Sequence, residues 1–120
     1  MDPRSVPEIR DALAALDHYE RSNAEYDDAQ AFREALEALA DYLEDEPDTP
    51  HRPFIVNVRE TYVRRMLERL GRLKNADDFT VIAHVVILRE TAADEVRALL
   101  KAQPALQPAF EQLLARAPGG

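Results

Sequence analysis

The sequence predicts an all-α fold, a compact bundle of five or six helices around a buried central helix at residues 79–90. Three observations lead to this prediction. Apolar residues recur at three- and four-residue steps through most of the chain, which is the spacing of one helix face. The ten residues 79–88 carry no charge, unlike any other stretch of this length. Gly71 is the one internal glycine, and tight hairpins usually need residues that accept a positive φ, so a sheet is disfavoured.

The charge-free stretch 79–88 also fits a strand covered on both faces, because it is rich in β-branched residues. Its flank favours a helix instead. Asp77 can accept hydrogen bonds from free N–H groups at a helix start, and Asp78 adds a second carboxylate near the positive end of the helix dipole. We therefore expect a helix. The alternative is an α+β fold with strands at 54–58 and 79–88.

Two helices are expected before the first proline-rich segment. The first lies near 6–21, where Ser5-Val6-Pro7-Glu8 has the spacing of a capping box. Ser22-Asn23-Ala24-Glu25 repeats that spacing, so the chain should turn there. A longer amphipathic helix then ends before Pro47. Its apolar stripe consists of Tyr26, Ala29, Phe32, Leu36, Leu39 and Leu43.

The segment 47–53 is expected to be a rigid connector, because three prolines within seven residues oppose helix formation. The charge of the chain changes sign here, so this connector is a candidate subdomain boundary. Neither side is large enough to predict independent folding, and we expect one domain over 1–120.

The second half of the chain is expected to continue as helices. Residues 54–58 open a helix or form a short strand, and a clear helical pattern follows as far as Lys74-Asn75. After the central stretch, Thr91 offers a cap for a helix that stops before Pro104. A last short helix is expected around Phe110, Leu113 and Leu114.

Charge is distributed unevenly along the chain. Residues 1–50 hold fifteen acidic and four basic residues, a net charge of −11, whereas residues 51–120 have a net charge of +3. The segment Arg52–Lys74 alone carries +5. This asymmetry predicts an acidic surface on the first two helices.

The amino-acid composition excludes several kinds of site and several classes of protein. Cysteine is absent, which excludes a disulfide framework, a cysteine metal site and a thiol nucleophile. No apolar run approaches the roughly 18–20 residues needed to span a bilayer. The first residues, MDPRSVPE, lack the pattern of a secretory signal. We therefore expect a cytoplasmic protein that does not associate with membranes.

No catalytic motif is found. The three histidines, His18, His51 and His84, form no zinc or di-iron motif, and no phosphate-binding glycine loop or nucleophile elbow occurs. His84 lies in the apolar central stretch, where a buried histidine could act as a general base or pH switch. A neutral core histidine with one hydrogen-bonded partner is the more common case and is our expectation. We predict no catalytic residue, no metal ligand and no cofactor.

One acidic pair offers an alternative. Glu34-x-x-Glu37 resembles half of the magnesium site of helical nucleotide pyrophosphohydrolases, in which a later Glu-x-x-Asp completes the ligand set. The second half is missing at a comparable spacing, since Asp45-x-x-Asp48 is broken by Pro47. A Mg- or Mn-dependent helical hydrolase is therefore an alternative to a non-enzymatic protein.

The Arg-rich helix 59–74 offers the other alternative, binding of nucleic acid or a phosphate ligand. Its basic patch consists of Arg64, Arg65, Arg69 and Arg72, with Arg59 and Lys74 at either end. The protein is acidic overall, Glu60 and Glu68 interrupt the cluster, and no aromatic platform lies beside it, so nucleic-acid binding is disfavoured.

The favoured function is a small acidic protein–protein interaction module that binds a basic partner through its N-terminal helices. Regulatory subunits, adaptors, secretion chaperones and immunity-type inhibitors of basic nuclease toxins are similar in charge and size. The predicted partner-binding residues are Glu37, Asp41, Glu44 and Asp45. A homodimer is also expected, because the apolar run 54–58 offers spare surface.

Overall fold

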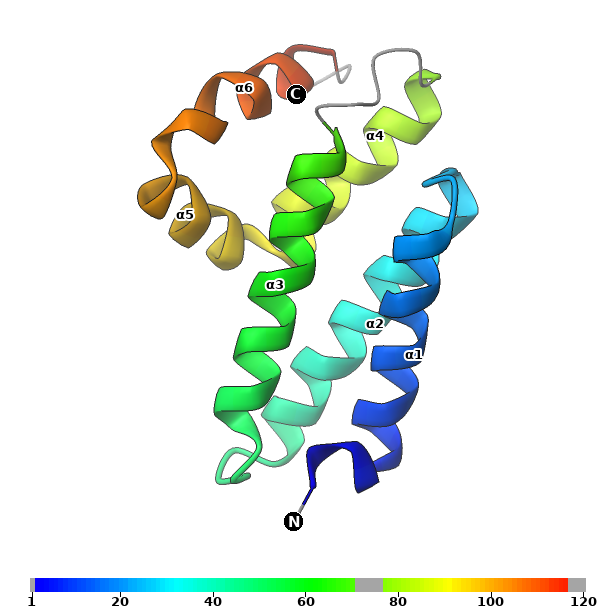
Figure 1. Ribbon diagram of the computed structural model, residues 1–120, viewed down its shortest axis with the longest axis vertical. Helices are drawn as coiled ribbons and strands as arrows, with labels where there is room; N and C mark the ends of the chain where they lie inside the picture. Colours follow the sequence, from blue (N-terminus) through cyan, green and yellow to red (C-terminus); the bar gives the residue numbers. More distant parts are fainter. Residues whose placement is uncertain (1, 71–76, 117–120) are drawn as a thin grey trace. The chain divides into compact units, whose positions relative to one another are not determined.

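The computed structural model describes residues 2–70 and 77–116, and it is helical throughout (Figure 1). Its α-helices are α1 (Pro7–Arg21), α2 (Tyr26–Asp45), α3 (Arg52–Leu70), α4 (Asp78–Val86), α5 (Ala93–Ala102) and α6 (Gln107–Arg116). Short 3₁₀ turns, η1 (Pro3–Ser5) and η3 (Pro104–Leu106), and a π-helical turn, η2 (Ile87–Thr91), complete the described chain. No strand occurs in these two ranges. The all-α prediction is confirmed, and the alternative with strands at 54–58 and 79–88 is wrong.

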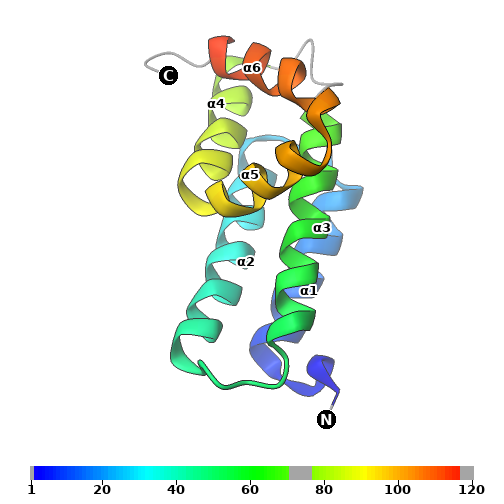
Figure 2. The same cartoon turned by 90° about the vertical axis from the view of Figure 1, so that its left-hand side faces the viewer.

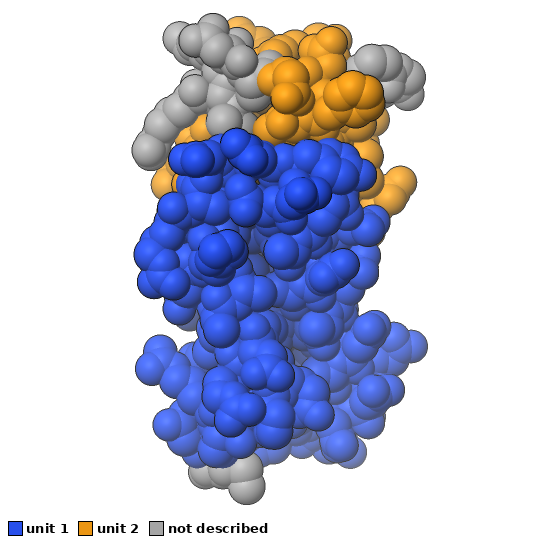
Figure 3. All heavy atoms as spheres, turned by 90° about the vertical axis from the view of Figure 1, so that its right-hand side faces the viewer, with its two compact units in different colours: residues 1–59 blue, residues 60–120 orange. Residues whose placement is uncertain are grey.

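The chain divides into two compact units, Met1–Arg59 and Glu60–Gly120 (Figure 3). The division falls inside helix α3, whereas the sequence suggested the connector 47–53 as a boundary. Unit 1 contains α1, α2 and the first turns of α3. Unit 2 contains the rest of α3 and the helices that follow it. Each unit is described by itself.

Unit 1 is organised by an antiparallel hairpin of α1 and α2 (Figure 1). The rings of Tyr19 and Phe32 pack with their centroids 4.5 Å apart and an interplanar angle of 54°. Such tilted aromatic contacts add to the stabilisation from the area they bury. The core of the hairpin is completed by the fully buried side chains of Ile9, Leu16, Leu36 and Leu39.

The turn between α1 and α2 is tight. Ala24 has φ 55°, a left-handed conformation that is costly for a residue with a Cβ, and its side chain is buried. The Ser22 hydroxyl donates to the Tyr19 carbonyl oxygen (2.7 Å) and accepts from the Ala24 N–H (3.1 Å). The predicted turn is confirmed, and its residues are held by hydrogen bonds of the serine side chain.

The two predicted N-terminal caps are placed differently in the structure. Helix α1 begins at Pro7 after Val6, which provides no side-chain cap, and the Ser5 hydroxyl donates to the Asp2 carbonyl oxygen instead. The predicted Ser5 capping box is therefore wrong, because residues 3–5 form the 3₁₀ turn η1. Helix α2 begins with a capping box formed by Glu25 and Asp28.

The connector after α2 is shorter than predicted. Helix α3 already begins at Arg52, with Pro53 in its first turn, where the missing N–H of proline does no harm. The Arg52 guanidinium donates to the carbonyl oxygen of Pro47 (3.0 Å) and to that of Leu43 (3.4 Å), closing the turn. The prediction that 47–53 is wholly non-helical is thus wrong at its last two residues.

The apolar run 54–58, which suggested a homodimer, is largely used within the chain. Ile55 and Val58 are buried, Phe54 is half-buried, and Val56 is 41% exposed. The homodimer stays a prediction.

Unit 2 contains the charge-free stretch as helix α4 and the π turn η2. The Asp77 carboxylate accepts a 2.8 Å hydrogen bond from the Thr80 N–H, as its capping role requires. Most side chains of the stretch are buried, and the Ala92 N–H donates to the Ile87 carbonyl oxygen five residues earlier, which closes the π turn. Phe79, however, is 75% exposed, and Arg89 and Glu90 are also exposed, so the predicted burial of 79–90 is wrong at both ends.

The remaining helices of unit 2 contact different parts of the charge-free stretch. Helix α6 packs against α4, and the π turn η2 leads into α5 (Figure 2). Helix α5 begins after Ala92, which gives no side-chain cap, so the predicted cap at Thr91 is wrong; it ends at Ala102, before Pro104 as predicted. The predicted helix end at Lys74-Asn75 lies outside the described residues.

Candidate functional site

Unit 1 contains a groove of about 590 Å³ between α1 and α2. The lining runs from Glu8 to Ala15 on α1 and from Ala31 to Asp45 on α2, and Glu46 follows directly after α2. Fifteen residues at 1.5 Å per residue make the α2 side about 22 Å long. The full lining is Glu8, Asp11, Ala12, Ala15, Ala31, Glu34, Ala35, Ala38, Asp41, Tyr42, Asp45 and Glu46.

Five alanines form most of the apolar part of the lining, and Tyr42 adds an aromatic side chain. Ala12 and Ala35 are each only 4% exposed, so they contribute to the contact between the two helices as well as to the groove. Ala38 is exposed and Ala31 and Ala15 are half-buried. Because these side chains stop at Cβ, they leave a hollow where longer side chains would fill the surface.

Carboxylates form the polar part of the lining, and no Lys, Arg or His is among the twelve residues. On α2, Glu34, Asp41 and Asp45 follow one another at steps of seven and four residues. At about 100° per residue these three positions lie within about 20° of the same helix face. Glu8 and Asp11 face the groove from α1, and Arg10 pairs with Asp11 at 3.6 Å in an exposed contact that contributes little.

The predicted partner-binding residues separate into two pairs. Asp41 and Asp45 line the groove, whereas Glu37 and Glu44 do not. Glu37 is instead within 3.9 Å of the Arg33 guanidinium. The positions of Glu37 and Glu44 lie about 60–80° around the helix from the row formed by 34, 41 and 45. The structure therefore brings together half of the predicted set.

Four carboxylates of the groove were missed as partner-binding residues. Glu34 could have been found from its seven-residue step to Asp41, which places both on one face. Glu8, Asp11 and Glu46 carry no comparable signal. Their place in the groove depends on how α1 packs against α2.

The alternative metal site is only partly assembled. Glu34 lines the groove and Glu37 does not, and Asp48 lies in the turn after the end of α2. Within residues 2–70 and 77–116, no three His, Asp or Glu side chains converge as a metal ion would require.

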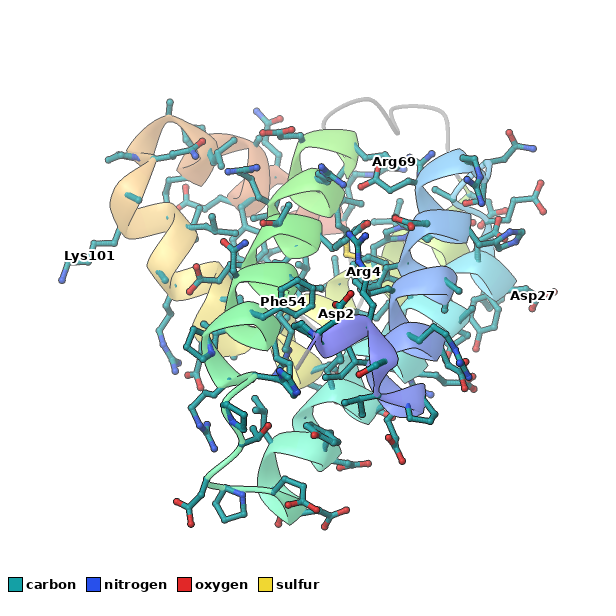
Figure 4. The ribbon with its side chains drawn as sticks, turned by 60° about the horizontal axis from the view of Figure 1, so that its bottom comes forward. Asp2, Arg4, Asp27, Phe54, Arg69 and Lys101 are labelled. Atoms are coloured by element: carbon teal, nitrogen blue, oxygen red, sulfur yellow. The ribbon has the colours of Figure 1, made fainter. Side chains whose placement is uncertain are left out.

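The described members of the basic patch lie in one unit, and the arginine that precedes them lies in the other. Arg59 belongs to unit 1, whereas Arg64, Arg65 and Arg69 belong to unit 2. The Arg65 guanidinium lies 4.9 Å from the ring centroid of Tyr62, a cation–π contact, and Arg69 lies in the last turn of α3 (Figure 4). Arg72 and Lys74 lie outside the described residues. The patch is therefore seen only in part.

His84 is fully buried in α4. Its Nδ1 donates to the Thr80 carbonyl oxygen at 2.8 Å, since a carbonyl oxygen can only accept. Burial lowers the pKa of His84 below its ordinary value, and the charge of Arg69 lowers this pKa further, although the hydrogen bond to Thr80 acts in the opposite direction. These contacts are those of a neutral core histidine, as expected from the sequence.

Comparison of the chain with protein-family models, with curated protein sequences and with solved structures finds no match. Of the described helices, none combines the length and the apolar character that crossing a bilayer requires.

Proposed function

We propose that this protein is a small acidic interaction module of the cytoplasm, without catalytic activity, which binds a basic protein partner through α1 and α2. One observation carries the proposal: the groove between these helices is lined by six carboxylates and by no basic residue. A regulatory subunit, an adaptor, a chaperone and an immunity-type inhibitor would all use such a surface in the same way.

The physical argument concerns the concentration of negative charge in the groove. Carboxylates that neighbour one another repel, and neutralising them with basic groups of a partner relieves that repulsion. Complementary charge also accelerates encounter and rejects acidic competitors. Exposed acidic residues elsewhere on the hairpin, such as Asp27 at the start of α2, which points outward in Figure 4, add to the long-range field. The groove is distinguished by combining this field with an apolar lining.

The test compares two double variants that remove the same charge from the same helix. Asp41→Asn with Asp45→Asn neutralises groove residues, and Glu37→Gln with Glu44→Gln neutralises residues outside it. Each tagged protein is used for affinity capture from native cell extract at moderate and at high salt, and captured protein and nucleic acid are both identified.

The expected result is that the wild type and the Glu37/Glu44 variant capture one basic protein in stoichiometric amount. The amount captured should be lower with the Asp41/Asp45 variant and at high salt. With exposed pairs contributing about 0.5–1 kcal/mol each, loss of two should weaken binding by roughly 5- to 30-fold. No specific protein at either salt, or equal capture by all three forms, would contradict the proposal. Capture of nucleic acid instead would favour the Arg-rich helix.

A further inference from the structure

We infer that the groove between α1 and α2 is the binding site for a basic amphipathic α-helix of a different protein. This inference rests on the proposed function, and it specifies the shape of the segment that the partner inserts. Two features of the groove lead to it: the spacing of its carboxylates and its alanine lining.

The carboxylate spacing matches a helix. Glu34, Asp41 and Asp45 span eleven residues of α2, about 17 Å along the helix axis. A helix lying alongside α2 has the same rise per residue. From Asp45 back to Glu34 the steps are four and seven residues, so basic side chains at positions i, i+4 and i+11 of a helix antiparallel to α2 recur at the same distances as the three carboxylates. An extended chain rises about 3.3 Å per residue and would need a different spacing.

The alanine lining allows close approach. Helices pack at axis separations of 8–10 Å, depending on the side chains at the contact, and small residues permit the lower values. Ala31, Ala35 and Ala38 give α2 such a surface beside its carboxylate row. The aliphatic stems of lysine or arginine can lie on these methyl groups while their charged ends reach the carboxylates.

A different protein fits better than a second copy of this chain. The Arg-rich helix of the described chain is α3, and three of its arginines already have interactions within the chain: Arg65 contacts the Tyr62 ring, and Arg59 and Arg69 have partners as well. A foreign helix with unpaired basic residues has no such contacts to lose when it binds.

The experiment uses two alanine-rich helical peptides of about 16 residues, a length that covers the α2 side of the groove. Both contain three arginines. In the first they occupy i, i+4 and i+11, and in the second they are distributed around the helix. Binding to the wild type is measured by fluorescence anisotropy at low salt. Two protein variants complete the set: Ala38→Leu, which fills the groove without changing charge, and Ala14→Leu, a matched change at an exposed alanine of α1 outside the groove.

The first peptide should bind at least about threefold more tightly than the second, the ratio expected when one exposed ion pair is gained. Ala38→Leu should remove this preference and Ala14→Leu should preserve it. Equal binding of the two peptides, or a preference unaffected by Ala38→Leu, would overturn the inference that the groove binds a helix. Dimerisation of the wild type, measured by light scattering and abolished by Ala38→Leu, would overturn it in favour of a second copy.

The two proposals fail in different ways. If Asp41→Asn with Asp45→Asn weakens the binding of both peptides equally while Ala38→Leu has no effect, the acidic surface binds basic ligands but is not a specific binding site for a helix. If the same double variant weakens neither peptide, the proposed function itself loses its support.

Discussion

The imidazole Nδ1 of His84 donates a 2.8 Å hydrogen bond to the carbonyl oxygen of Thr80, one helical turn earlier, and both side chains are buried. This contact fixes the proton of the neutral ring on Nδ1. It also places a titratable group where a positive charge would be poorly solvated and near Arg69.

Stability should therefore fall in mild acid. Because the pKa of His84 is lowered in the folded chain, mainly by burial, the unfolded chain binds more protons below about pH 6.5. The contribution of neutral His84 to stability is present above that pH and is lost as the pH decreases. Urea unfolding at pH 7.5 and 5.5 measures the loss, which His84→Gln should reduce. The same substitution at His18, which is exposed, serves as control; an equal pH response in the wild type and His84→Gln would contradict the prediction.

The aromatic contact of Tyr19 with Phe32 should be a main support of the hairpin. Phe32 is fully buried, and Phe32→Ala should cost about 3–5 kcal/mol. The same truncation at Phe79, which is 75% exposed, should change stability by no more than about 0.5 kcal/mol. Chemical denaturation of both variants provides the comparison. A large loss at Phe79 would show that this side chain is packed.

The turn between the first two helices should tolerate glycine and reject β-branched residues. At Ala24, with φ 55°, glycine would relieve about 1–2 kcal/mol of strain from the left-handed conformation. Two losses would offset most of this gain: a buried methyl group is removed, and the unfolded chain gains conformational entropy. Ala24→Gly should then leave the unfolding free energy within about 1 kcal/mol of the wild type, whereas Ala24→Val should lower it by more than about 2 kcal/mol.

The control for the turn is Ala14→Val at an exposed helical position, which should cost only about 0.5 kcal/mol. If Val at position 24 were as well tolerated as Val at position 14, the left-handed conformation of the turn would be refuted.

The start of α4 should depend on its capping carboxylate. The hydrogen bond from the Thr80 N–H lowers the pKa of Asp77, which shows that the ionised carboxylate is the better acceptor. Asp77→Ala should lower the thermal midpoint, and Asp77→Asn should retain most of it because asparagine is also a good cap. Similar midpoints for Asp77→Ala and the wild type would exclude this role.

Helix identity could be read from the sequence because it depends on local spacing. The stripe from Tyr26 to Leu43 predicted α2, and Pro104 marked the end of α5. The exact ends of the helices and the residues that cap them were harder to predict from the sequence. Ser5 was available as a cap, but the 3₁₀ turn that follows Asp2 uses its hydroxyl. Pro53 was expected to exclude a helix. It lies in the first turn of α3, however, where the helix makes no hydrogen bond from the N–H that proline lacks.

By itself, the sequence determined that this protein is all-helical and that its acidic residues concentrate in the first two helices, because periodicity and charge are properties of neighbouring residues. Tertiary structure decided which of those acids share a surface. Asp41 and Asp45 were predicted together with Glu37 and Glu44, but only the first pair lines the groove with Glu34 and the carboxylates of α1. That grouping follows from the angle at which α1 meets α2, which is set by the packing of buried side chains such as Leu16, Tyr19 and Phe32.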